Sequence, residues 1–189
     1  MKIKIYCQSF VLPYLEATNH TQDFQFITPN QYTDFLQKAF QDLSPQNITI
    51  LQLYKLHQDK TGRRSQQNLN TYNSPLSIEI DSQYLHTTIT DQIQTISIIQ
   101  YDFTRYVKKQ LLSQFITMMN QYHILQKQSI TQTITNFYNT FDLDEDTLIS
   151  ENLRTHWRRN KPYKAGGREI FRNKLLSTQY LSHPTAQNN

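Results

Sequence analysis

The basic residues of this chain gather towards its C-terminal end. From Arg154 to Asn189 the sequence holds eight lysines and arginines against one acidic residue, whereas from Met1 to Leu153 it holds eleven against fourteen. The formal net charge of +4 therefore resides in one segment. Such a concentration of cations favours contact with phosphate groups. The competing interpretation is a solvated tail with no partner.

The first of these cations belong to a predicted amphipathic helix that follows Ser150. Leu153 and Trp157 are four residues apart and predict the inward face, while Arg154 and Arg158 predict an outer face. A basic helix face can lie in the major groove of duplex DNA, where arginine reads guanine and other side chains hold phosphates. The predicted nucleic-acid contacts of this segment are Arg154, His156, Arg158, Arg159 and Lys161.

Beyond Pro162, which ends the predicted helix, the positive charge continues. We expect residues 162–189 to form a flexible basic arm with a hinge at Gly166-Gly167. Such an arm adds sequence-independent affinity by releasing counterions, and its middle part could form a helical turn on binding. The cations of the arm are Lys164, Arg168, Arg172 and Lys174.

Pairing with nearby acids is the alternative role for the arginines of the helix. Asp142, Asp144, Asp146 and Glu151 lie close in sequence and could leave a solvated, ion-paired face. The weakness of this alternative is that acids are nearly absent after residue 161, so the cations of the arm have almost no acidic residues nearby in sequence to pair with.

Two patterns that imitate known catalytic or metal sites lack an essential residue. Asp142, Asp144 and Asp146 match the start of a calcium-binding EF-hand loop, but Thr147 stands in place of the required glycine. Leu153 also stands where the bidentate glutamate belongs. His156 and Arg159 have the His-x-x-Arg spacing of tyrosine recombinases, but no tyrosine follows His183 and the chain is too short.

Other side chains that could do chemistry are too scattered. Glu79 and Asp81 share a strand face, but no lysine follows at the spacing that a metal-dependent nuclease needs. The six histidines are far apart, and Cys7 is the one cysteine, which excludes a zinc cage or a disulfide framework. We therefore predict a protein that is not an enzyme and has no metal, cofactor or small-molecule substrate.

Residues 1–88 are expected to form an α+β layer. Alternating apolar residues predict strands at Lys2–Tyr6 and Pro75–Asp81. A β-branched apolar run predicts a third strand at Ile48–His57, for which a helix is the alternative prediction. The polar stretch 58–74 is expected to be an exposed loop.

One helix is predicted between the first two of these strands. Thr28 is its expected N-cap, Pro29 its first residue and Ser44-Pro45 its end. The apolar residues that follow helical spacing are Tyr32, Phe35, Leu36, Ala39, Phe40 and Leu43.

Residues 89–161 are expected to be a helical lobe. Apolar residues at three- and four-residue steps from about Thr90 to Leu125 predict one long helix or two collinear ones. A shorter helix capped by Ser129 follows, then an acidic turn of about eight residues, then the basic helix. This predicts a helix-turn-helix-like pair, although the turn is longer than the usual three or four residues. The fold class is therefore α+β, ending in a basic tail.

The segment from Leu76 to Lys161 resembles small proteins of bacterial phages and mobile elements that are regarded as DNA-binding regulators. Most of the resemblance lies in the acidic turn and in the Leu-x-x-x-Trp-Arg-Arg pattern that starts at Leu153. It implies a helical C-terminal DNA-binding region in a transcriptional regulator or accessory factor. The stretch after Tyr163 has no counterpart in this resemblance.

Two functional hypotheses follow. The first is a protein that binds duplex DNA, as a monomer or as a homodimer joined along the long helix. The second is a phage assembly or virion-associated protein that acts through protein partners, with its basic tail on packaged genome or on an acidic partner. Neither a signal peptide nor an apolar stretch of about 18 residues is evident, so no membrane role is expected. The expected location is the cytoplasm of a bacterial host cell, or alternatively the virion.

Overall fold

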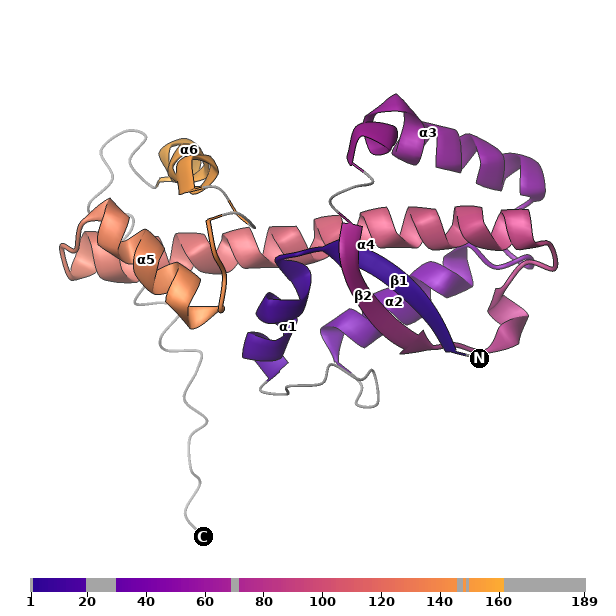
Figure 1. Cartoon of the computed structure of the whole chain (residues 1–189), viewed down its shortest axis with the longest axis horizontal. Helices are drawn as coiled ribbons and strands as arrows, with labels where there is room; N and C mark the ends of the chain where they lie inside the picture. The colour runs from indigo at the N-terminus through magenta and orange to yellow at the C-terminus, as the bar shows by residue number, and fades with distance from the viewer. Residues whose placement is uncertain (1, 20–29, 69–71, 146–147, 149, 162–189) are drawn as a thin grey trace, which may run out of the picture.

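The structure is a computed structural model that describes residues 2–19, 30–68, 72–145, 148 and 150–161. Helix α4 (Ile89–Met118) is its axis and runs nearly the length of the molecule (Figure 1). Thr88 caps its start by accepting a hydrogen bond from the backbone N–H of Asp91. The predicted long helix is confirmed, and its buried face consists of Ile98, Ile99, Phe103, Val107, Leu111 and Phe115.

The helix continues beyond Met118 as the π-helical segment η3 (Met119–Leu125). Met119 is fully buried, but Leu125, which was expected on the inner face, is 57% exposed. The wider π-helical turn shifts the faces of the helix, so the three- and four-residue spacing no longer points inward there.

Two antiparallel strands form the sheet, β1 (Lys2–Gln8) and β2 (Tyr72–Glu79). Ile3 lies opposite Ile78 and Ile5 opposite Leu76, and these four side chains are buried. Both strands were predicted from the alternation, although β2 begins three residues before the expected Pro75 and ends at Glu79, so Ile80, expected to point inward, follows the strand and is half-buried. Because a two-stranded sheet is marginal alone, its stability depends on α4, against which β1 packs.

The predicted third strand at Ile48–His57 is wrong, because this segment begins helix α3 (Ile50–Asn68). Thr49 and Gln52 form a reciprocal cap: each backbone N–H donates to the other residue's side-chain oxygen. Leu53 is fully buried, so the face of α3 that carries it packs against the rest of the protein.

The stretch 58–74 is not a loop up to Asn68, because α3 continues through it. It is held to α4 by an ion pair between Lys60 and Asp102. At the other end of the stretch, β2 has already begun at Tyr72. The α+β class is confirmed, but the N-terminal part has two strands, three α-helices and the short 3-10 helix η2 (Ser82–Tyr84) among the described residues.

The other two helices of this part are α1 (Val11–Asn19) and α2 (Gln31–Asp42). The cap of α2 is Asn30, whose side chain accepts the backbone N–H groups of Tyr32 and Thr33. The expected cap and proline at residues 28–29 lie outside the described residues. The helix ends before Ser44-Pro45, as predicted.

Helices α5 (Ile130–Thr140) and α6 (Ser150–Asn160) cover the second half of α4 (Figure 1). Ser129 caps α5 as predicted, by accepting the backbone N–H of Gln132. The apolar stripe of α5 packs on α4 and α1: the Phe137 ring lies 5.1 Å from that of Phe115, and the Phe141 ring 5.3 Å from that of Tyr14. One continuous core thus joins residues 1–88 to residues 89–161.

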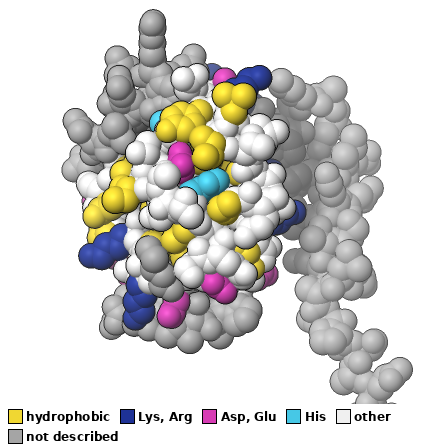
Figure 2. All heavy atoms as spheres, turned by 90° about the vertical axis from the view of Figure 1, so that its right-hand side faces the viewer, with side chains coloured by type: hydrophobic (Ala, Val, Ile, Leu, Met, Phe, Trp, Pro, Cys, Tyr) yellow, Lys and Arg dark blue, Asp and Glu magenta, His cyan; other side chains and the backbone are white. Residues whose placement is uncertain are grey.

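Apolar side chains remain exposed where α3 and α4 begin, at one end of the molecule. Figure 2 shows this end, with apolar side chains in several clusters and lysines and arginines at its rim. Leu51 is 81% exposed and Ile89 is 75% exposed, both more than most surface apolar residues. We call this surface the apolar end; its residues are Ile50, Leu51, Ile89 and Ile93.

Candidate nucleic-acid interface

Helix α6 is fixed by the two residues that the sequence predicted as its inward face. Leu153 is fully buried and Trp157 is 3% exposed, and α6 packs against both α4 and α5. The Trp157 ring meets the ring of His123 edge to face, with 6.1 Å between centroids. The outer face of α6 is therefore held in a defined orientation.

The described residues of the connection between α5 and α6 include buried apolar anchors. Asp142 adopts a left-handed conformation with φ 49°, which aspartate tolerates better than most residues, so the helix ends without glycine. Leu143 and Leu148 are buried, and the Tyr138 hydroxyl donates to the backbone carbonyl of Leu148. The connection, residues 141–149, is longer than that of a standard helix-turn-helix, and anchors at both ends compensate for its length.

Burial raises the pKa of Tyr138 to about 12, and the charge of Glu145 adds to this effect. The phenol is therefore a neutral donor at physiological pH and keeps its bond to Leu148. Ser150, expected to cap α6, is instead its first residue and donates its hydroxyl to the Glu145 carboxylate.

The predicted cations of α6 lie in three different settings. Arg154 donates to the Thr131 hydroxyl on α5 at 2.9 Å, and Arg158 pairs with Glu151 at 3.5 Å, both partners being exposed. Arg159 and Lys161 are exposed, and within the described ranges their side chains form no hydrogen bond or ion pair. Pairing with acids thus holds for Arg158, and an exposed pair of this kind contributes little stability.

His156 is half-buried and belongs to the side of α6 that faces α4. Burial lowers its pKa, and the nearby charge of Arg159 lowers it further. The ring is therefore neutral at physiological pH and acts as a hydrogen-bonding group instead of a cation. Asn160 lies beside it, with its side-chain N–H donating to the His156 carbonyl at 2.8 Å.

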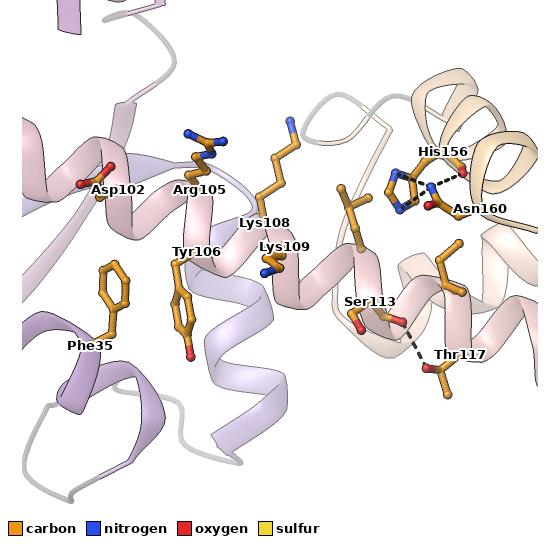
Figure 3. Close-up of a pocket in the computed structure, with 12 residues that line it drawn as sticks. Phe35, Asp102, Arg105, Tyr106, Lys108, Lys109, Ser113, Thr117, His156 and Asn160 are labelled. Atoms are coloured by element: carbon orange, nitrogen blue, oxygen red, sulfur yellow. Dashed lines mark hydrogen bonds between the residues drawn. The ribbon is translucent and has the colours of Figure 1, made fainter. Parts of the chain in front are cut away.

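A groove of about 950 Å³ separates this side of α6 from α4 (Figure 3). Sequence analysis missed its main cations, which come from α4: Arg105, Lys108 and Lys109. All three are exposed, and among the described residues none forms an ion pair or hydrogen bond. The signal was present as Arg-x-x-Lys-Lys, because residues three and four apart share one face of a helix. It was overlooked because these cations lie far in sequence from the basic C-terminal segment.

The remaining groove lining is nearly free of negative charge. Among the described lining residues, Asp102 is the one acid, and Lys60 pairs with it. Phe35 and Tyr106 stack on each other at the same wall, with centroids 4.4 Å apart and planes 13° apart. The groove therefore combines unpaired cations with an aromatic surface.

The arm residues Lys164, Arg168, Arg172 and Lys174 lie outside the described residues. Within the described part of the chain, no three acids, histidines or cysteines gather closely enough to hold a metal ion. Nor does any helix there have both the length and the apolar character required to cross a bilayer. The chain matches no family model, no curated protein and no solved structure.

Proposed function

We propose that this protein binds DNA without catalysing a reaction, and that α6 and the middle of α4 hold the phosphate backbone. The observation that carries the proposal is the shared groove: cations of α4 and the polar residues His156 and Asn160 of α6 line it, and Arg159 is near enough to His156 to lower the pKa of that ring. Because the one described acid of the lining is already paired, the local field is positive. A surface of this kind attracts polyanions.

Each cation that meets a phosphate releases condensed counterions, so the binding constant should fall steeply with salt. Arg159 and Lys161 are ready for such contacts, whereas Arg158 must first leave Glu151 and Arg154 is committed to Thr131. The resemblance to phage and mobile-element proteins suggests the role of a transcriptional regulator or accessory factor. Arg158 and Arg159 would make the sequence-specific contacts with base edges.

The test is a titration of fluorescently labelled duplex DNA at several salt concentrations, read by anisotropy. R158E/R159E should weaken binding by about tenfold or more, since each reversal exchanges a phosphate attraction for a repulsion. The matched control is K2E/K4E, which makes the same charge change on exposed lysines of β1. If the full-length protein does not bind duplex DNA at low salt, the proposal is wrong.

The contribution of the basic arm can be separated in the same assay. Removal of residues 163–189 should weaken duplex binding and flatten its salt dependence, because four predicted phosphate contacts are lost. Selection from a random duplex pool, with and without the arm, would then show whether any sequence preference belongs to α6. A preference that vanishes with the arm would place specificity outside α6.

A second candidate, an assembly or virion-associated protein, is favoured by the apolar end. Exposed apolar side chains gathered on one face are typical of surfaces that bind other proteins. On this hypothesis, the apolar end would meet a partner and the basic arm would dock on packaged genome. Light scattering separates the candidates: a large homo-oligomer favours assembly, and a monomer or dimer that binds duplex DNA favours the first.

A further inference from the structure

The groove between α4 and α6 offers two kinds of contact side by side. Its cations, Arg105, Lys108 and Lys109, have no hydrogen-bond or ion-pair partner among the described residues, and its wall carries the stacked pair of Phe35 and Tyr106. We propose that this groove binds a single strand of nucleic acid, with phosphates on the α4 cations and unpaired bases on the aromatic wall. The inference rests on the proposed function and adds a ligand class and a site to it.

The aromatic wall is arranged to receive a base. Phe35 covers one face of Tyr106, and the ring of Tyr32 meets Tyr106 edge-on at 6.0 Å. In Figure 3, Phe35 lies to one side of Tyr106 and the groove continues on the other side, towards Lys109. Tyr106 is half-buried and lines the groove, and its ring contacts with Phe35 and Tyr32 hold it in place. Rigid aromatic side chains of this kind stack bases without sequence preference.

The charges are placed to follow a backbone. Arg105 and Lys109 are separated by about one helical turn, and Lys108 lies between them along the axis of α4; all three line the groove. Where α6 lines the groove, His156 and Asn160 offer hydrogen-bonding groups. A strand in this groove would thus meet both cations and neutral polar groups.

The choice of a single strand over a duplex comes from the position of Tyr106. In a duplex the bases are stacked on each other inside the helix, and their faces cannot reach a half-buried ring in a groove. An unpaired base has a free face and can enter. Duplex DNA can still bind the exposed cations of α6, because contact with phosphates does not require access to the Tyr106 ring.

The experiment compares labelled oligothymidylate with the duplex used above, in wild type and three variants. K108E/K109E should weaken oligothymidylate binding by about tenfold or more and duplex binding by less, with K2E/K4E again as the matched control. Y106L should weaken oligothymidylate binding by about tenfold, whereas Y106F, which keeps a stacking ring, should stay near wild type. Thermal unfolding of each variant checks that Y106L is folded at the assay temperature.

The outcomes separate this inference from the proposed function. If K108E/K109E binds oligothymidylate as tightly as K2E/K4E does, the groove is not the strand site, whatever the duplex results show. Wild type that binds duplex DNA but not oligothymidylate also overturns the inference alone. Wild type that binds neither overturns both. If Y106L fails to fold, the lysine variants still decide, and oligouridylate in parallel distinguishes an RNA strand from a DNA strand.

Discussion

The two ends of α4 present opposite surfaces. At its start, beside the start of α3, the exposed side chains are apolar, and Leu51 and Ile89 are largely uncovered (Figure 2). From its middle towards α6, the exposed side chains include Arg105, Lys108 and Lys109, which have no acidic partners in the described chain. The hydrophobic effect drives apolar surface to meet apolar surface, whereas unpaired cations attract anions. The same helix therefore carries an apolar surface at its start and a cationic surface from its middle onwards.

The largest expected effect concerns the packing of α6 on α4. Trp157→Ala should lower the free energy of unfolding by about 3–5 kcal/mol, because it removes a large buried ring from the seam of α6 with α4. Urea denaturation followed by circular dichroism measures this change. Arg158→Ala on the exposed face is the control, with an expected effect within about 0.5 kcal/mol. Equal losses for the two variants would mean that α6 is not anchored through Trp157.

The next prediction asks whether the two ends act independently. L51E/I89E places charge on the apolar end and should leave nucleic-acid affinity within about twofold of wild type, because substitutions at distant sites are usually additive. Any self-association should decrease, since charges oppose burial of that surface. Light scattering and the anisotropy titration measure the two properties. A large loss of nucleic-acid binding without unfolding would show that the ends are coupled.

The third prediction uses the pKa of His156, which lies below the ordinary value of 6.5 because of burial and Arg159. The folded state binds this proton less readily than the unfolded state, so stability from this group is present at neutral pH and falls as pH falls below 6.5. Binding changes in the opposite direction, because a protonated ring beside phosphate is favourable. Nucleic-acid affinity should rise by about threefold between about pH 7.5 and 5.5.

The measurement for His156 is anisotropy at constant ionic strength across that pH range. His156→Ala should flatten the dependence without removing binding. A pH dependence that persists unchanged in His156→Ala would assign it to another group and take His156 out of the interface.

The smallest expected effect concerns the ion pair at the groove. Asp102→Asn removes the one described acid of the lining and frees Lys60. Stability should fall by no more than about 1 kcal/mol, since the pair is partly exposed. Single-strand affinity should rise by about two- to fivefold, because the groove becomes more positive. Urea denaturation and oligothymidylate anisotropy measure these two changes, and weaker binding by Asp102→Asn would contradict the charge argument.

The error at α3 shows why periodicity alone was insufficient. The β-branched start at Ile48 favoured a strand, yet Thr49 and Gln52 form a local cap that begins a helix. The pattern Thr-x-x-Gln was readable in the sequence. What the sequence could not show was that α4 offers α3 a surface to pack on, with Leu53 buried and Lys60 paired to Asp102. Such tertiary contacts commonly override local propensity.

Local features determined much of the fold. The alternation in β1 and β2, the spacing in α4, the Ser129 cap and the inward placement of Leu153 and Trp157 could be predicted from patterns among residues near in sequence. The candidate site, in contrast, depends on contacts between residues far apart in sequence. Arg105, Lys108 and Lys109 meet the side of α6 that carries His156 only because buried side chains dock α6 on α4. About fifty residues separate the two walls, and only packing brings them together.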